Sequence, residues 1–142
     1  MRLLKLYLPN DFKIFDDNYF DFILHNHVME HIPGSYIDHL HEFQRILAPG
    51  GAMIFSIPGP SMSKLTEEGG EHLSSPEERL AKFGQVDHFK QFGRDLVDFL
   101  EASDGMRFQF DQLTDIERVR MSIPKGSNRF LIWRKNQRRQ EN

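Results

Sequence analysis

A cluster of ionisable side chains follows the first long apolar run of this chain. The run over residues 20–24 leads to the polar pair Asn26 and His27, and Glu30 and His31 follow a few residues later. Histidine titrates near neutral pH and burial can raise the pKa of a glutamate, so such a pair can orient a substrate or accept its proton. We therefore predict Glu30 and His31 as catalytic residues. The alternative interpretation is that they only fix a turn.

The residues around this cluster predict a strand, a helix and a second strand. Residues 22–24 are continuously apolar, which is typical of a parallel strand buried on both faces. Ser35 stands where it can cap a helix that ends at residues 49–51, and residues 52–57 predict the second buried strand. The apolar positions of the helix recur at helical spacing: Ile37, Leu40, Phe43 and Leu47. Ligands of open α/β sheets sit outside the carboxyl ends of strands, where Asn26 and His27 would lie.

The remainder of the chain predicts one domain over residues 1–142. A short strand is expected over residues 3–8, and residues 58–93 are expected to be irregular apart from a short helix over 75–83. A helix follows over 94–103. Two closing strands, over residues 108–113 and 129–133, complete the predicted elements.

Two blocks of this sequence resemble class I S-adenosylmethionine-dependent methyltransferases of the type 11-like group. The first, over residues 20–32, reads Phe-Asp-x-Ile-x-x-Asn-His-Val-x-Glu-His-Ile; the second is Leu47-Ala48-Pro49-Gly50-Gly51 followed by a strand. The resemblance implies an α/β fold with a truncated Rossmann-like methyltransferase sheet. It also implies a parallel βαβ core and a carboxyl-terminal antiparallel strand pair.

The resemblance further implies where the cofactor would lie. By position in the family, Asn26, His27 and Val28 would flank the methionine part of S-adenosylmethionine. Tyr7 and Leu8 would stand at the end of the preceding strand, with Tyr7 in place of an aspartate that contacts the adenine amino group. A phenol does not reproduce a carboxylate acceptor at neutral pH.

The glycine-rich turn of the family does not occur in this sequence. No two glycines are separated by a single residue, so there is no Gly-x-Gly to let the backbone approach a cofactor. We therefore expect the carboxyl-terminal portion of a methyltransferase, active only if a cofactor-binding half is supplied. A homodimer or a separately encoded amino-terminal half is the expected partner. The alternative is a non-catalytic, degenerate methyltransferase that acts as a binding or companion subunit.

A second polar and aromatic block suggests the acceptor side of the site. Residues 83–94 resemble a block that borders the acceptor pocket in one bacterial branch of the family. Gln85, His88 and Phe92 are accordingly predicted to bind substrate, and a small molecule is the expected acceptor. The alternative is a loop whose aromatic side chains cover the sheet.

Composition narrows the remaining classes of function. The net charge of −3 argues against a nucleic-acid partner, and the absence of any long apolar run argues against a membrane segment. The chain has no cysteine, and a cytoplasmic location is expected. Residues 134–142 are basic and are expected to fray. A metal site is not expected, although several histidines raise the question: His25, His27, His31, His39 and His41.

Overall fold

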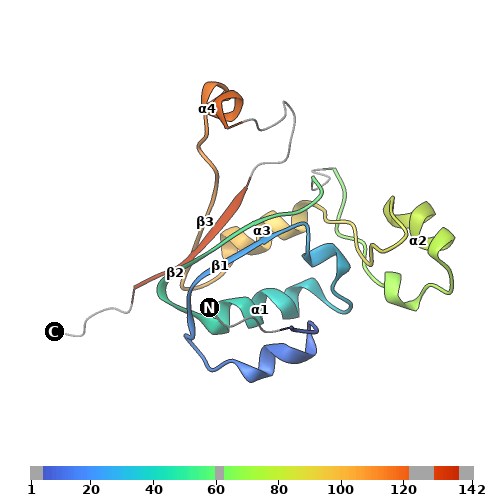
Figure 1. The fold of residues 1–142 in the computed structure, drawn as a ribbon, viewed down its shortest axis with the longest axis horizontal. Coiled ribbons are helices and arrows are strands. Elements are labelled where there is room, and N and C mark those ends of the chain that lie inside the picture. The colour runs from blue at the N-terminus through green and yellow to red at the C-terminus, as the bar shows by residue number, and fades with distance from the viewer. Residues whose placement is uncertain (1–4, 60–62, 122–129, 138–142) are drawn as a thin grey trace.

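The described strands form one mixed sheet. The computed structural model describes residues 5–59, 63–121 and 130–137. Within these residues the sheet has the strand order β1-β2-β4-β3 (Figure 1), with bounds β1 Phe20–Asn26, β2 Leu47–Ser56, β3 Met106–Phe110 and β4 Leu131–Lys135. β1 and β2 pair in parallel, and the other pairs are antiparallel. The predicted α/β class, the parallel strand pair and the closing antiparallel pair are confirmed.

Helix α1, Tyr36–Ile46, connects β1 to β2 and confirms the predicted strand–helix–strand unit. Its apolar face buries Leu40, Phe43 and Ile46, so it packs against the sheet as the helical spacing predicts. The second strand starts earlier than predicted. Residues 49–51 lie inside β2 rather than in a turn before it, because the chain enters the sheet directly at the end of the helix.

The prediction that the first strand is buried on both faces is wrong. β1 is an edge strand, and Phe22 and Leu24 expose 53% and 67% of their surface. Ile23 packs against the core from the other face of the strand. Continuous apolar residues identify a strand, but they do not show which of its faces a neighbour covers.

Two predictions near the chain ends need correction. The expected strand over 3–8 is not seen in residues 5–8, which precede a 3-10 helix, η1, over Asn10–Ile14; residues 3 and 4 lie outside the described part. The guanidinium of Arg45 holds η1 against α1 by donating to the carbonyl oxygens of Phe12 and Phe15, at 3.0 and 2.9 Å. At the other end, Arg134 and Lys135 belong to β4 rather than to a frayed tail, and residues 138–142 lie outside the described residues.

Helix α4, Asp115–Arg120, was not predicted. Thr114 and Glu117 form a reciprocal capping box at its start. The helix has only six residues, so its sequence shows little helical periodicity. The predicted helices over 75–83 and 94–103 are confirmed as α2, Pro76–Phe83, and α3, Arg94–Ala102. α2 lies beyond the ends of the strands, whereas α1 and α3 run alongside the sheet (Figure 1).

The segment over residues 58–93 docks against the start of α1. Ser35 occupies the N-cap position, but its side chain makes no capping bond; instead the carboxylate of Glu68 accepts from the Tyr36 amide at 2.7 Å. The buried ammonium of Lys90 donates to the carbonyl oxygens of Ile32 and Gly34, at 2.6 and 2.7 Å. Burial acts to lower the pKa of Lys90, with Glu68 acting in the opposite direction. These bonds fix the 58–93 segment beside the carboxyl end of β1.

The core lies between the sheet and its helices. Trp133, Phe55 and Leu100 are completely buried there, and the indole nitrogen of Trp133 donates to the Leu100 carbonyl at 3.2 Å. The helices over the described residues are all too short or too polar to cross a bilayer.

Candidate functional site

The polar residues at the carboxyl end of β1 are held against the end of β2. Asn26 is the last residue of β1, and its side-chain oxygen accepts a hydrogen bond from the Ser56 hydroxyl. The next residue, His27, has a positive φ of 50° and donates its amide to the Ser56 carbonyl at 3.0 Å. The chain therefore turns sharply away from the sheet at His27. Val28 follows and leads into a 3-10 helix, η2, over Met29–His31.

Glu30, His31 and His88 meet beside this turn. The carbonyl of Glu30 accepts from the Phe89 amide at 2.8 Å, which joins η2 to the segment that carries His88. One potential ligand atom from each of Glu30, His31 and His88 lies within 4.8 Å of the other two. The rings of His31 and His88 pack edge to face with centroids 4.9 Å apart. The fold thus joins two predicted catalytic residues to a predicted substrate-binding residue.

Gly70 allows the segment with His88 to lie this close to the rest of the chain. The Gly70 amide donates to the carbonyl of Phe89 at 2.9 Å. A Cβ atom on Gly70 would lie 2.5 Å from the Phe89 Cα and 2.8 Å from the His88 carbonyl oxygen, closer than real Cβ contacts. A side chain at position 70 would therefore displace His88.

The carboxylate of Glu30 is fully buried. Its Oε1 atom lies 3.3 Å from His27 Nδ1 and 3.9 Å from His31 Nε2. Among the residues that the structure describes, however, no donor makes a hydrogen bond to either oxygen. A buried carboxylate beside imidazoles can take up a proton or hold a cation, and either role suits a site of chemistry.

The residues predicted to contact the cofactor are only partly brought together. Leu8 and Val28 line one apolar cavity of about 260 Å³ along β1, whereas Tyr7 is exposed and is not part of its lining. His25 is the one described residue of this lining with a polar side chain; its ring stacks on Phe43 with centroids 5.4 Å apart, and burial lowers its pKa to about 4.

This cavity matches only part of S-adenosylmethionine. Its aliphatic and aromatic walls suit an apolar surface such as a base. The ribose hydroxyls and the charged amino-acid end of the cofactor need polar or charged partners, and the lining residues include no carboxylate, lysine or arginine. The described residues therefore do not fit the whole cofactor.

The three residues predicted to bind substrate lie in different environments. His88 is buried in the cluster, Gln85 is exposed beyond the end of α2, and Phe92 is buried in the core with its ring edge-on to Tyr36. Their spacing along the chain could not reveal this separation, because the direction of each side chain depends on how the 58–93 segment docks.

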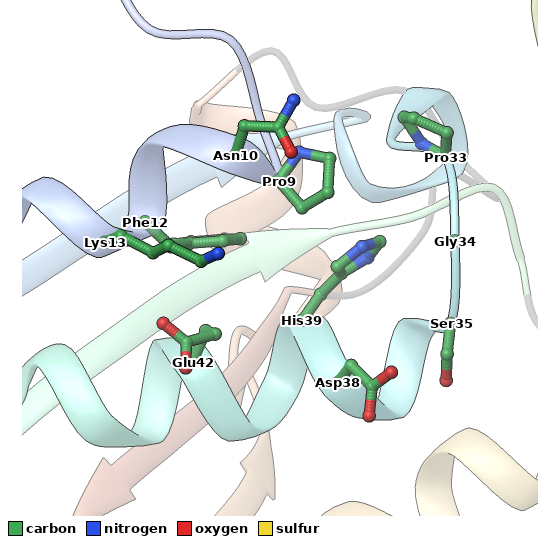
Figure 2. A pocket seen from close by; sticks show the side chains of 10 residues that line it. All are labelled: Pro9, Asn10, Phe12, Lys13, Pro33, Gly34, Ser35, Asp38, His39 and Glu42. Atoms are coloured by element: carbon green, nitrogen blue, oxygen red, sulfur yellow. The ribbon is translucent and has the colours of Figure 1, made fainter.

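Sequence reasoning did not identify the cavity drawn in Figure 2. It has a volume of about 300 Å³ and lies between η1 and the first turns of α1, with Phe12 and Lys13 on one wall and His39 and Glu42 on the other. Burial, followed by the charge of Lys90, lowers the pKa of His39 to about 4, so this imidazole is neutral near pH 7. No local signal in the sequence joins these residues, because η1 and α1 are brought together by tertiary packing.

A family model described as a methyltransferase domain matches residues 8–116. The match includes β1, α1 and β2 together with the polar cluster at the end of β1. The chain therefore belongs to the methyltransferase domain family. A search of curated proteins found no match.

Proposed function

We propose that this chain forms the acceptor side of an S-adenosylmethionine-dependent methyltransferase that acts on a small molecule. The observation that supports this function is the meeting of Glu30, His31 and His88 at the carboxyl end of β1, in a chain of the methyltransferase domain family. Methyl transfer depends chiefly on holding a nucleophile in line with the methyl group. Glu30 Oε1 and His31 Nε2 would accept the proton that the nucleophile loses.

Binding of the whole cofactor would require contacts from another polypeptide. The apolar cavity lined by Leu8 and Val28 could receive an uncharged part of the cofactor, and Asn26 and His27 lie at the strand end beside it. The described residues that line this cavity offer no partner for the charged groups of S-adenosylmethionine. We propose that transfer occurs only when a partner supplies those contacts, and the alternative function is a non-catalytic companion subunit with the same fold.

Calorimetric titration with S-adenosylmethionine tests the enzymatic function. Saturable binding in the micromolar range, competed by S-adenosylhomocysteine and weakened by Val28→Asp, would support it. The substitution Val119→Asp on the exposed surface of α4 is the matched control and should leave binding unchanged. The titration is made at a protein concentration where the chain is associated with its partner, and the absence of binding at millimolar cofactor under that condition would instead favour the companion subunit.

The free edge of β1 supports a proposal about the partner. An exposed apolar edge strand readily pairs with another strand. Phe22 and Leu24 are exposed on this seven-residue strand, whereas the opposite edge strand, β3, is shorter and exposes Arg107 and Gln109. We propose that a second copy of the chain pairs along β1.

Light scattering across a range of protein concentrations tests this association. A dimer is expected, and Leu24→Lys should convert it to a monomer because a charge would enter the paired edge. Val119→Lys places the same charge on an exposed site of α4 and should leave the dimer intact. A strict monomer at the highest concentration would contradict pairing of two copies and point to a different chain as the partner.

A further inference from the structure

The buried carboxylate of Glu30 is unusual because its charge is uncompensated by hydrogen bonds. Both of its oxygens are inaccessible to solvent and accept no hydrogen bond from the described residues. Removing a carboxylate from water costs several kcal/mol unless a proton, a cation or strong hydrogen bonds replace the lost hydration. The nearest basic groups among the described residues are the imidazoles of His27 and His31, whose Nδ1 and Nε2 atoms lie 3.3 and 3.9 Å from Glu30 Oε1, and a bound cation is the alternative partner.

The orientation of the His31 ring bears on which group can balance the charge of Glu30. Its Nδ1 atom lies 3.1 Å from the carbonyl oxygen of Asp87, which can only accept, so Nδ1 carries the proton. In neutral His31 the Nε2 atom then has a free lone pair and lies 3.9 Å from the carboxylate of Glu30. That separation is too long for a hydrogen bond. Metal-binding histidines commonly donate their second ring nitrogen to a carbonyl oxygen in this way.

His88 supplies a second nitrogen close to the same point. Its side chain is buried, with only 5% of the residue exposed, and it belongs to the group whose ligand atoms lie within 4.8 Å of one another. Neighbouring ligand atoms of a tetrahedral zinc site lie about 3.3 Å apart. The side chains of the group would therefore close by up to about 1.5 Å around an ion.

We propose that Glu30, His31 and His88 bind a divalent transition-metal ion, with Zn²⁺ as the probe of that class. Two imidazole nitrogens and one carboxylate suit Zn²⁺ and similar ions better than Mg²⁺ or Ca²⁺, which prefer oxygen ligands. Three protein ligands leave a coordination position for water or a substrate. The side chain of His31 is 35% exposed, so that position can be reached from solvent.

This metal site goes beyond the proposed methyl transfer and does not depend on it. With a metal bound, Glu30 and His31 would act as ligands and not as the proton acceptors proposed above, and an oxygen held at the open position would lose its proton more readily. The competing explanation is an imidazolium on His27 or His31 that pairs with Glu30 in the absence of any ion. The two explanations make different predictions for a titration with metal.

Titration of the tag-free full chain with Zn²⁺ tests the proposal by calorimetry, and Co²⁺ reports ligand geometry through its visible absorption. We expect one bound ion per chain, and we expect Glu30→Gln and His88→Ala each to weaken Zn²⁺ binding at least about tenfold. His72→Ala is the matched control, since the His72 side chain is 83% exposed and lies outside the group; it should bind Zn²⁺ as the parent does.

The fold of each variant is checked by circular dichroism in the presence of a chelator. Binding of one ion that His72→Ala retains and the folded Glu30→Gln variant loses supports the site. The proposal is wrong if the parent chain binds no Zn²⁺ at micromolar concentration, or if Glu30→Gln binds it as tightly as the parent. Should His88→Ala unfold, the Co²⁺ spectrum of the parent decides: absorption typical of tetrahedral nitrogen and oxygen ligands supports the site, and an octahedral aquo-like spectrum contradicts it.

Discussion

Two carboxylates of this protein, Glu30 and Asp95, have opposite surroundings. Asp95, in the first turn of α3, accepts three hydrogen bonds, from the Thr66 amide at 2.7 Å, the Thr66 hydroxyl at 2.8 Å and the Tyr36 hydroxyl at 2.9 Å. Burial acts to raise the pKa of Asp95, but these bonds outweigh it and hold the pKa below its usual value. Glu30 is more deeply buried and accepts no hydrogen bond from the described residues.

The difference is consistent with a structural role for Asp95 and with the role proposed for Glu30. The fold supplies Asp95 with all the donors that its charge needs, so Asp95 ties the 58–93 segment to α1 and α3. The fold buries Glu30 without such donors beside two imidazoles, so its charge is available to something that is not part of the chain. The predictions below test this contrast.

The largest expected effect is on Asp95. Asp95→Ala should lower the free energy of unfolding by about 3 kcal/mol, because it leaves the amide and hydroxyl of Thr66 and the hydroxyl of Tyr36 without their acceptor. Tyr36→Phe removes a single one of these bonds and should cost about 1 kcal/mol. Urea denaturation measures both. An equal loss of unfolding free energy in Asp95→Ala and Tyr36→Phe would contradict the conclusion that Asp95 accepts three stabilising hydrogen bonds.

A second prediction concerns acid and a group that also lacks partners, His25. Both ring nitrogens of His25 are buried and make no hydrogen bond with the part of the chain that the structure describes, and burial lowers its pKa to about 4. Between about pH 6.5 and pH 4 the unfolded chain therefore binds a proton that the folded chain does not, so stability falls as the pH falls through this window. His39, with a pKa of about 4, adds to the same trend.

The substitution His25→Phe should reduce this loss of stability by about 2 kcal/mol, because the aromatic ring packs on Phe43 without taking up a proton. His72→Phe is the exposed control. Urea denaturation at pH 7 and pH 4.5 measures the change. An unaltered pH dependence in His25→Phe would show that the pKa of His25 does not differ between the folded and the unfolded chain.

The smallest expected effect is on Glu30 in the absence of metal. At pH 8 with a chelator, Glu30→Gln should leave the free energy of unfolding unchanged or raise it by about 1 kcal/mol, because a neutral amide replaces a buried charge that accepts no hydrogen bond from the described residues. Glu101→Gln on the exposed surface of α3 is the matched control. A loss as large as that of Asp95→Ala would mean that Glu30 is paired within the protein, and the contrast between the two carboxylates would fail.

Sequence reasoning predicted the elements whose signals are local. The apolar spacing of α1 and the Ser-Pro start of α2 depend on a few neighbouring residues, and both helices formed as predicted. The strand pair at the carboxyl end was also found. The wrong predictions depend on contacts with distant segments. Exposure of Phe22 on β1 follows from strand order. The chain before β1 packs on α1 through η1 and Arg45, and residues 5–8 form no strand.

For the candidate site, the sequence by itself determined that Glu30 and His31 follow a strand end in a chain of methyltransferase type. It also marked His88 as a polar residue within an aromatic block. Only the tertiary structure decided that His88 lies against the other two, because the docking of the 58–93 segment through Lys90 and the close approach at Gly70 bring together residues more than fifty positions apart. Such a juxtaposition depends on packing between distant segments, which no local pattern encodes.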